Sequence, residues 1–305
     1  ASGATLQLGG GSYTIADGIA VAGAGSWAIG TPLALGSGTV AGDVGVSFLA
    51  GGILQGSGVF NANSNITMAG GDLQDTLTLN LRHTASNTGS TALENNVINI
   101  HGNLSHTAST IASVSTFSPR INILSNAVYD VRGDHIFVQG DAGDKLVNQP
   151  GGTLRKSTGT GTATLDWGFT NLGAVEVQIG TLTFSENSHL DGTYAVASGA
   201  TLQLGGGSFT IADGISVGGA GTWDVSRPLA LGNGTVAGDI DVVFNPPGVF
   251  QGSGVFNANS NLVLAGGDLQ GTVTLNLNRP ATINGSTTME GNVINIHSNL
   301  SHTAS

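Results

Sequence analysis

The chain has 305 residues, of which 50 are Gly, 9% are charged and 39% are hydrophobic, and its formal net charge is -11. Apolar residues are too abundant for an intrinsically disordered chain, and eight Lys and Arg residues are too few for a nucleic-acid or anionic-membrane surface. The absence of Cys excludes disulfides and thiolate metal sites, and no apolar run reaches the roughly 20 residues that span a bilayer.

Short segments with alternating apolar and polar residues follow one another along the chain, and Gly or Asn bounds most of them. A period of two residues predicts a β-strand with one buried face. In chain order these segments are 4–10, 12–18, 25–30, 32–36, 44–48, 65–71, 76–81, 97–102, 120–124, 135–140, 174–180 and 181–185. The apolar residues expected to face inward are Leu6, Leu8, Tyr13, Ile15, Trp27, Ile29, Leu33, Leu35, Val46, Phe48, Leu79, Leu81, Ile98, Ile100, Val175 and Val177.

The chain also contains a long internal repeat. Residues 1–109 align without a gap onto residues 197–305, and 77 of the 109 aligned residues are identical. The repeat unit is therefore 196 residues long, and 110–196 is the rest of it. We expect further copies on both sides, so that residues before Ala1 would resemble 185–196. Differences between the copies gather at 28–31, 49–54, 82–88 and 92–95, which are predicted to be exposed loops.

Two all-β architectures accommodate such strands. One is a right-handed parallel β-helix, or β-solenoid, with coils of about 20 residues; the other is a row of antiparallel β-sandwiches of about 100 residues each. Strand motifs recur about every 20 residues, and Gly and Asn suit coil corners that require positive φ. The hairpin dipeptides Asn233-Gly234 and Asn284-Gly285 have no Asn-Gly counterpart in the first copy. The sequence therefore favours one continuous β-solenoid over residues 1–305.

A family resemblance accompanies this pattern. Residues 169–211 read FTNLGAVEVQIGTLTFSENSHLDGTYAVASGATLQLGGGSFTI. This segment resembles the degenerate repeats of bacterial surface proteins of the filamentous-haemagglutinin and autotransporter-passenger kind. The resemblance is to a style of repeat, and it covers most of 150–235 and weaker parts elsewhere. It implies an exported protein, a right-handed parallel β-helix and a role as adhesin, stalk or fibre, and it transfers no catalytic residue.

The most charged stretch is 129–146, which carries Asp130, Asp134, Asp141 and Asp144. Carboxylates beside Gly turns can hold calcium, but the nine-residue calcium repeat of β-helices is absent, and the sequence favours a solvated loop over a calcium site. The same stretch contains Arg132-Gly133-Asp134, the tripeptide of integrin ligands, and a tripeptide recurs readily by chance.

Other chemistry-bearing residues are sparse. His101 and His106 recur as His297 and His302 without the further ligands that zinc needs, so surface or stacked histidines are expected. Trp27, Trp167 and Trp223 would stack on sugars if exposed, but their spacing predicts core packing. The glutamates Glu94, Glu176, Glu186 and Glu290 are scattered, whereas glycoside cleavage needs paired carboxylates. The sequence assigns no catalytic, cofactor-binding or metal-ligating residue.

Asn residues gather near the predicted turns: Asn61, Asn63, Asn65, Asn96, Asn99 and Asn103. Stacked coils can align such amides into hydrogen-bonded ladders. We predict that some of them form inward-facing turn ladders, so that Asn63→Ala would cost more stability than a surface change.

These patterns predict a structural protein: a shaft or filament segment of a large, repetitive bacterial surface or matrix protein, located outside the cell. Its expected partners are further copies of the same repeat, joined within one chain or by end-to-end or lateral self-association. The alternative is an adhesin that binds glycans or cells through the solenoid surface or a separate tip. A polysaccharide-active enzyme is the third and least supported interpretation. Nucleic acid and a membrane span are not expected.

Overall fold

A computed structural model describes residues 3–107, 110–114, 116–139 and 142–303. These residues contain strands and no helix, and they form a parallel β-solenoid of about 15 turns with coils of about 20 residues. A helix that is long and apolar enough to cross a membrane is accordingly not found among them. The chain divides into two compact units, which are described separately. Unit 1 comprises residues 1–155 and 166–168, and unit 2 comprises residues 156–165 and 169–305.

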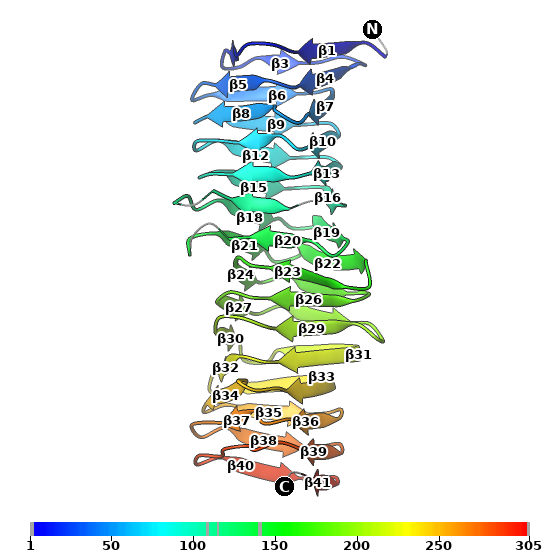
Figure 1. Ribbon diagram of the computed structural model, residues 1–305, viewed down its shortest axis with the longest axis vertical. Coiled ribbons are helices and arrows are strands. Elements are labelled where there is room, and N and C mark those ends of the chain that lie inside the picture. Colours follow the sequence, from blue (N-terminus) through cyan, green and yellow to red (C-terminus); the bar gives the residue numbers. More distant parts are fainter. Residues whose placement is uncertain (1–2, 108–109, 115, 140–141, 304–305) are drawn as a thin grey trace. The chain divides into compact units, whose positions relative to one another are not determined.

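In unit 1 each coil contributes three successive strands, one to each of three sides (Figure 1). The first side stacks β1 (Thr5–Leu8), β4 (Ser26–Ile29), β7 (Gly45–Phe48), β10 (Ile66–Ala69), β13 (Ala85–Gly89), β16 (Asn103–His106) and β19 (Val128–Arg132). The second stacks β2 (Tyr13–Ile15), β5 (Pro32–Leu35), β8 (Ile53–Gly56), β11 (Asp72–Leu73), β14 (Thr91–Leu93), β17 (Ile111–Ser113) and β20 (Ile136–Val138). The third stacks β3 (Ala20–Val21), β6 (Thr39–Gly42), β9 (Val59–Ala62), β12 (Thr78–Leu81), β15 (Val97–Ile100), β18 (Arg120–Ile123) and β21 (Lys145–Asn148).

Unit 2 repeats this arrangement. One side stacks β25 (Ala174–Val177), β28 (Thr193–Val196), β31 (Ser216–Val225), β33 (Thr235–Phe244), β35 (Val255–Ala258), β38 (Thr274–Leu277) and β40 (Val293–Ile296). A second side stacks β23 (Thr162–Leu165), β26 (Thr181–Phe184), β29 (Thr201–Leu204), the C-terminal halves of β31 and β33, β36 (Leu262–Leu264), β39 (Ala281–Ile283) and β41 (Leu300–His302). The third holds β27 (Ser188–Leu190), β30 (Phe209–Ile211), β32 (Pro228–Leu231), β34 (Val249–Gly252) and β37 (Asp268–Leu269). Strands β22 (Thr153–Thr158) and β24 (Gly168–Asn171) run from one unit into the other.

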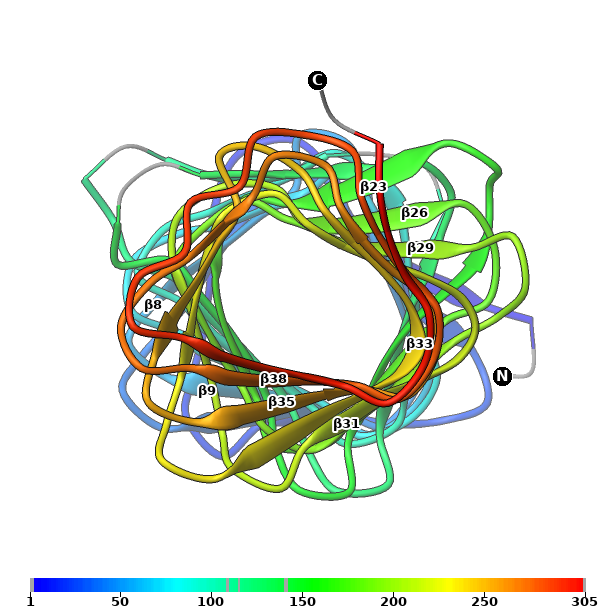
Figure 2. The same cartoon turned by 90° about the horizontal axis from the view of Figure 1, so that it is seen from below.

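The pairing within each unit confirms a solenoid and rules out the sandwich alternative. Strand β12 pairs in parallel with β9 on one side and β15 on the other, so that Asn80 lies between Asn61 and Asn99. Antiparallel sandwiches would instead join neighbouring strands by hairpins. Figure 2 shows β35 and β38 of unit 2 next to one another in the wall of the coil, and the two strands pair in parallel. The inward side chains of these strands, such as Phe256 and Leu275, are buried.

The core lies inside the coils, because every second residue of a strand points inward. Most of the predicted inward residues are buried, among them Phe48, Leu79 and Ile100. The two copies also build the same core contacts. The rings of Trp27 and Phe60 lie 5.8 Å apart at 45°, and those of Trp223 and Phe256 lie 6.1 Å apart at 45°.

Glycine is required at one kind of corner. Gly56 and Gly252, at equivalent positions of the two copies, have φ of 118° and 116°. A Cβ atom would lie 2.1 Å from the carbonyl oxygen of Leu35 at the first site, and 2.2 Å from that of Leu231 at the second. Both the backbone conformation and the close approach of the preceding coil therefore exclude a side chain.

The predicted burial of Leu6 and Tyr13 is wrong, although their register is as expected. Leu6 lies beside Trp27 on the inner side, yet it is 52% exposed, and Tyr13 is 38% exposed. The reason is that β1 and β2 pair with a coil on one side only. In the second copy the counterparts Leu202 and Phe209 are each 1% exposed.

The segments that differ between copies are not simply exposed loops, as the sequence had suggested. They include Ile29, Leu54, Ala85 and Leu93, which are all buried in strands. Ile29, Leu54 and Leu93 are replaced by the apolar Val225, Phe250 and Met289, which apolar packing tolerates. Ala85 is kept as Ala281, and the buried Asn87 is replaced by Ile283.

Candidate functional site

The most regular surface feature is a flat, uncharged sheet face that we call the asparagine face. In unit 1 it consists of the outward residues of β6, β9, β12 and β15, which are Thr39, Ala41, Val59, Asn61, Thr78, Asn80, Val97 and Asn99. The equivalent residues of unit 2 lie on β33, β35, β38 and β40 and are Thr235, Ala237, Val255, Asn257, Thr274, Asn276, Val293 and Asn295.

Its amides form a ladder. The Nδ2 of Asn80 donates to the Oδ1 of Asn61 at 2.8 Å, and the Nδ2 of Asn99 donates to the Oδ1 of Asn80 at 2.9 Å. Asn122 of β18 extends the ladder with a bond of 2.8 Å to Asn99. In unit 2, Asn276 donates to Asn257 at 2.7 Å and Asn295 donates to Asn276 at 2.8 Å. Because a carboxamide has two N–H donors and two lone pairs, the ladder occupies only part of its capacity.

The expected ladders of inward turn amides are therefore corrected. Asn61 and Asn99 do form a ladder, but on the outer face of strands, and Asn63, Asn65 and Asn103 are exposed. Asn80 and Asn122 were missed, although Asn recurs at intervals of 19 residues between positions 61 and 99.

One predicted amide does face inward. Asn96 is fully buried, and its Nδ2 donates to the carbonyl oxygens of Gln74 and Asp75, both at 3.1 Å. Its Oδ1 accepts the backbone N–H of Glu94 at 2.9 Å. A single buried amide thus satisfies three backbone groups at a corner, where the strand ladder is interrupted.

A second sheet face serves for comparison, and we call it the serine–threonine face. It consists of the outward residues of β4, β7, β10 and β13 in unit 1, which are Ser26, Ala28, Gly45, Ser47, Thr67, Ala69, Ser86 and Thr88. In unit 2 the equivalents are Thr222, Asp224, Asp241, Val243, Val263, Ala265, Thr282 and Asn284. The Asp241 carboxylate accepts a hydrogen bond from the Ser260 hydroxyl, which lowers its pKa.

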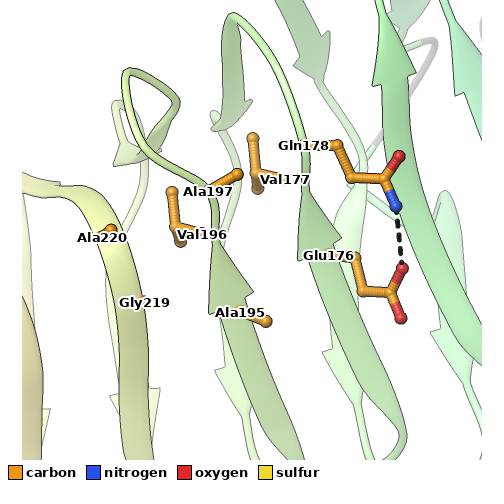
Figure 3. Close-up of a pocket in the computed structure, with 8 residues that line it drawn as sticks. All are labelled: Glu176, Val177, Gln178, Ala195, Val196, Ala197, Gly219 and Ala220. Atoms are coloured by element: carbon orange, nitrogen blue, oxygen red, sulfur yellow. Dashed lines mark hydrogen bonds between the residues drawn. The ribbon is translucent and has the colours of Figure 1, made fainter.

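A shallow hollow of about 290 Å³ lies over β25, β28 and the first half of β31 in unit 2 (Figure 3). Its floor is built from small side chains at Ala195, Ala197 and Ala220. Glu176 and Gln178 stand together at one margin, and the Gln178 amide donates to Glu176 at 3.4 Å. One carboxylate without a second acid or base offers no general acid–base pair.

The acidic stretch does not assemble a calcium site among the described residues. No group of three or more His, Asp or Glu side chains gathers anywhere in the part of the chain that the structure describes. Asp144 is fully buried, whereas Asp130 faces outward and lies 4.0 Å from the Nε of Arg132. Asp141 lies outside the described residues. In the Arg132-Gly133-Asp134 tripeptide, Arg132 is the last residue of β19, and Gly133 and Asp134 lie in the bend before β20.

The three tryptophans and His106 belong to the core, whereas the other histidines are exposed or half-buried. Trp27, Trp167 and Trp223 are at most 1% exposed, as predicted, so none of them can stack on a sugar. His106 is buried, and its ring stacks on that of His135 with centroids 4.7 Å apart. His101 is exposed, and partial burial together with the nearby Arg82 charge lowers its pKa.

The structure brings two carboxylates together on neighbouring coils, Asp75 and Glu94, which the sequence had not paired. Both act as corner caps. Asp75 accepts the backbone N–H of Gly56 and Glu94 accepts that of Asp75, each at 2.9 Å. The second copy has Gly271 in place of Asp75, so this pair is not repeated. Glu176, Glu186 and Glu290 lie on other parts of the surface.

Comparisons with protein-family models, with curated proteins and with solved structures find no match.

Proposed function

We propose that this chain is a structural segment of an extracellular fibre or shaft, of the kind built by bacterial surface β-helix proteins. In such a fibre further copies of the same repeat stack coil upon coil. One observation carries the proposal: the two copies of the 196-residue repeat build the same parallel coil pairings around the same buried ring contacts, so that a coil of one copy is interchangeable with its counterpart in the other.

The first example is the strand edge formed by β1, β2 and β3. Leu6, Tyr13 and Ile19 are 52%, 38% and 44% exposed there. In the second copy, β26, β27 and β28 lie against the equivalent strands β29, β30 and β31. The counterparts Leu202, Phe209 and Ile215 are then 1%, 1% and 8% exposed. In the second copy, the coil 181–196 thus buries the inward residues of the strands that follow it.

The second example is the opposite edge, formed by β40 and β41. Ile296 is 53% exposed, whereas its counterpart Ile100 is fully buried. In the first copy β18 and β19 pair with β15 and β16 and complete the packing. Unpaired strand edges are templates for adding further strands. In the first copy, the coil of β18 and β19 thus buries the inward residues of the strands that precede it.

Two further features favour a shaft over an adhesin. The copies reproduce one another's core contacts, as interchangeable building blocks should. The tryptophans, which would supply stacking platforms for glycans, are all in the core. The resemblance to filamentous-haemagglutinin and autotransporter-passenger repeats agrees with this role, and the extracellular location belongs to the same proposal.

The test is to extend the chain by one repeat unit, residues 110–196 followed by 1–109. Electron microscopy should show a particle longer by about ten coils, or roughly 47 Å at about 4.8 Å per coil, with an unchanged cross-section. Hydrogen exchange at β40 and β41 should slow, because a coil now covers them. A separate globule, or no slowing at β40 and β41, would contradict stacking. Saturable binding of the 305-residue chain to a glycan array would instead favour the adhesin.

A further inference from the structure

The two copies differ unevenly over their surface. The same four coils carry both the asparagine face and the serine–threonine face. On the serine–threonine face seven of the eight outward residues named above differ between the copies, and Ala69 is kept as Ala265. Gly89, which pairs with Ala69, is also kept, as Gly285. On the asparagine face all eight are identical. Strands β5, β8, β11 and β14 lie between these two faces. Four of their six outward residues are identical between the copies, a fraction between those of the two faces.

The hydrogen-bonded ladder is a folding reason for keeping the three asparagines of each copy, but it does not explain why the other five outward residues are also identical. Residues on both faces are half-buried or exposed, stand on strands of similar length and belong to the same coils. The serine–threonine face accepts changes as large as Ala28 to Asp224, Gly45 to Asp241 and Thr67 to Val263. A sheet surface that only had to remain soluble would accept such changes on the asparagine face as well.

We propose that the asparagine face is the lateral contact surface of the fibre, and that its occupant is the asparagine face of a second copy of this chain. This inference builds on the proposed structural function and identifies the surface through which fibres bundle.

Charge supports a second copy as the partner. The chain carries a net charge of -11, so two copies repel one another at most approaches. None of the eight outward residues of the asparagine face is charged in either unit, although the Nε of Arg82 donates to the Oδ1 of Asn61 at 3.2 Å in unit 1. The serine–threonine face of unit 2, by contrast, bears Asp224 and Asp241 among its own outward residues. Charged side chains also occur on the strands that follow the face on the same side of unit 1: β18 carries Arg120, and β21 carries Lys145. An uncharged patch is the surface on which two like-charged molecules meet at least cost.

The shape and chemistry of the face also fit a sheet of its own kind. Val59, Thr78 and Val97 form one column, and the asparagine ladder forms the next. β-Branched columns can interdigitate between packed sheets, and Asn ladders recur in stacked-sheet interfaces. A polysaccharide would need exposed aromatic platforms, and the three tryptophans lie in the core instead.

The area sets the strength of a single contact. Four strands of four residues cover roughly 250 Å², from about 4.8 Å between strands and about 3.3 Å per residue. A stable interface needs about 800 Å² per partner. One face is therefore too small to hold a dimer alone, and a row of faces in one array would act together through effective concentration. Repetition in every 196-residue unit is what such a weak, additive contact requires.

The experiment uses the full chain, which contains no Cys. Thr78→Cys places one thiol on the asparagine face, and Thr67→Cys places one on the serine–threonine face of the same coil. Both threonines are half-buried. A bis-maleimide with a spacer of about 10 Å matches the separation of packed sheets. We expect at least fivefold more cross-linked dimer from Thr78→Cys, and dilution with excess wild-type chain should reduce it.

A second pair, Thr274→Cys and Thr282→Cys, repeats the comparison in unit 2. Circular dichroism melting checks that all four variants fold. Equal dimer yields from the two faces would overturn the proposal. X-ray scattering of the cross-linked dimer distinguishes lateral contact from end-to-end stacking. A larger cross-section supports lateral contact, whereas greater length alone supports only the stacked fibre. Protection of Thr78→Cys by cello- or chito-oligosaccharides, without dimers, would assign the face to a polysaccharide instead.

Discussion

Asparagine serves different purposes in this chain according to where the backbone places it. Asn80 belongs to an outer ladder, Asn63 is exposed and donates to Asp43 at 2.6 Å, and Asn96 closes a buried corner. The sequence showed that asparagines cluster near turns, but the side that each faces depends on whether it lies within a strand or just beyond its end. A shift of one residue reverses that side, and strand ends are hard to place from sequence to within one residue.

At the residue scale we expect Asn96→Ala to destabilise unit 1 by about 2–3 kcal/mol, because it leaves buried backbone groups without partners. Asn63→Ala should cost less than about 0.5 kcal/mol, as an exposed substitution does. Urea unfolding followed by circular dichroism measures both. Equal losses of unfolding free energy for the two variants would show that the buried hydrogen bonds of Asn96 stabilise the fold no more than an exposed side chain does.

At the scale of the element, the coil corner decides which residues are permitted. The sequence predicted the parallel coils correctly because strand motifs, glycines and the long repeat all indicated one period. It did not predict which glycines are indispensable, because that depends on the carbonyl of the preceding coil. Gly56 closely approaches the carbonyl of Leu35, whereas Gly45 has only the carbonyl oxygen of Asn65 near its Cβ direction, at 4.0 Å.

We therefore expect Gly56→Ala to destabilise unit 1 by about 2–3 kcal/mol, from backbone strain and the clash with the Leu35 carbonyl. Gly252→Ala should do the same in unit 2. Gly45→Ala is the matched control, since the second copy already carries Asp241 at that position, and its effect should stay within about 0.5 kcal/mol. Denaturant midpoints provide the comparison, and a neutral Gly56→Ala would contradict the proposed steric requirement.

At the scale of the whole molecule, burial depends on neighbours along the stack as much as on sequence. The alternating pattern marks Leu6 and Leu202 as the same inward residue, and no local signal says that one of them is uncovered. The candidate contact surface was equally hidden, because only the structure sorts the differences between the copies by the side of the coil on which they fall.

Leu202→Ala should lower the free energy of unfolding by about 2–5 kcal/mol, as large-to-small changes in a core do. Leu6→Ala should lower it by less than about 1 kcal/mol. Unfolding of the 305-residue chain in denaturant tests this difference. If a coil like 181–196 is fused ahead of Ala1, the cost of Leu6→Ala should rise towards that of Leu202→Ala. No rise in the fused chain would mean that the edge is not completed in this way.

The parallel stacking also determines how each unit responds to mechanical load. Backbone bonds such as that from Thr78 to Gly58 and that from Thr274 to Gly254 join residues one coil apart. Tension applied through the chain would open these bonds one coil after another instead of shearing a whole sheet at once. Each opened coil of about 20 residues releases roughly 65 Å of extended chain at about 3.3 Å per residue, in place of a coil rise of about 4.8 Å. Under a sudden load, a unit of this design would lengthen in many small, reversible steps. A shaft made of such units would therefore dissipate the energy of the load gradually.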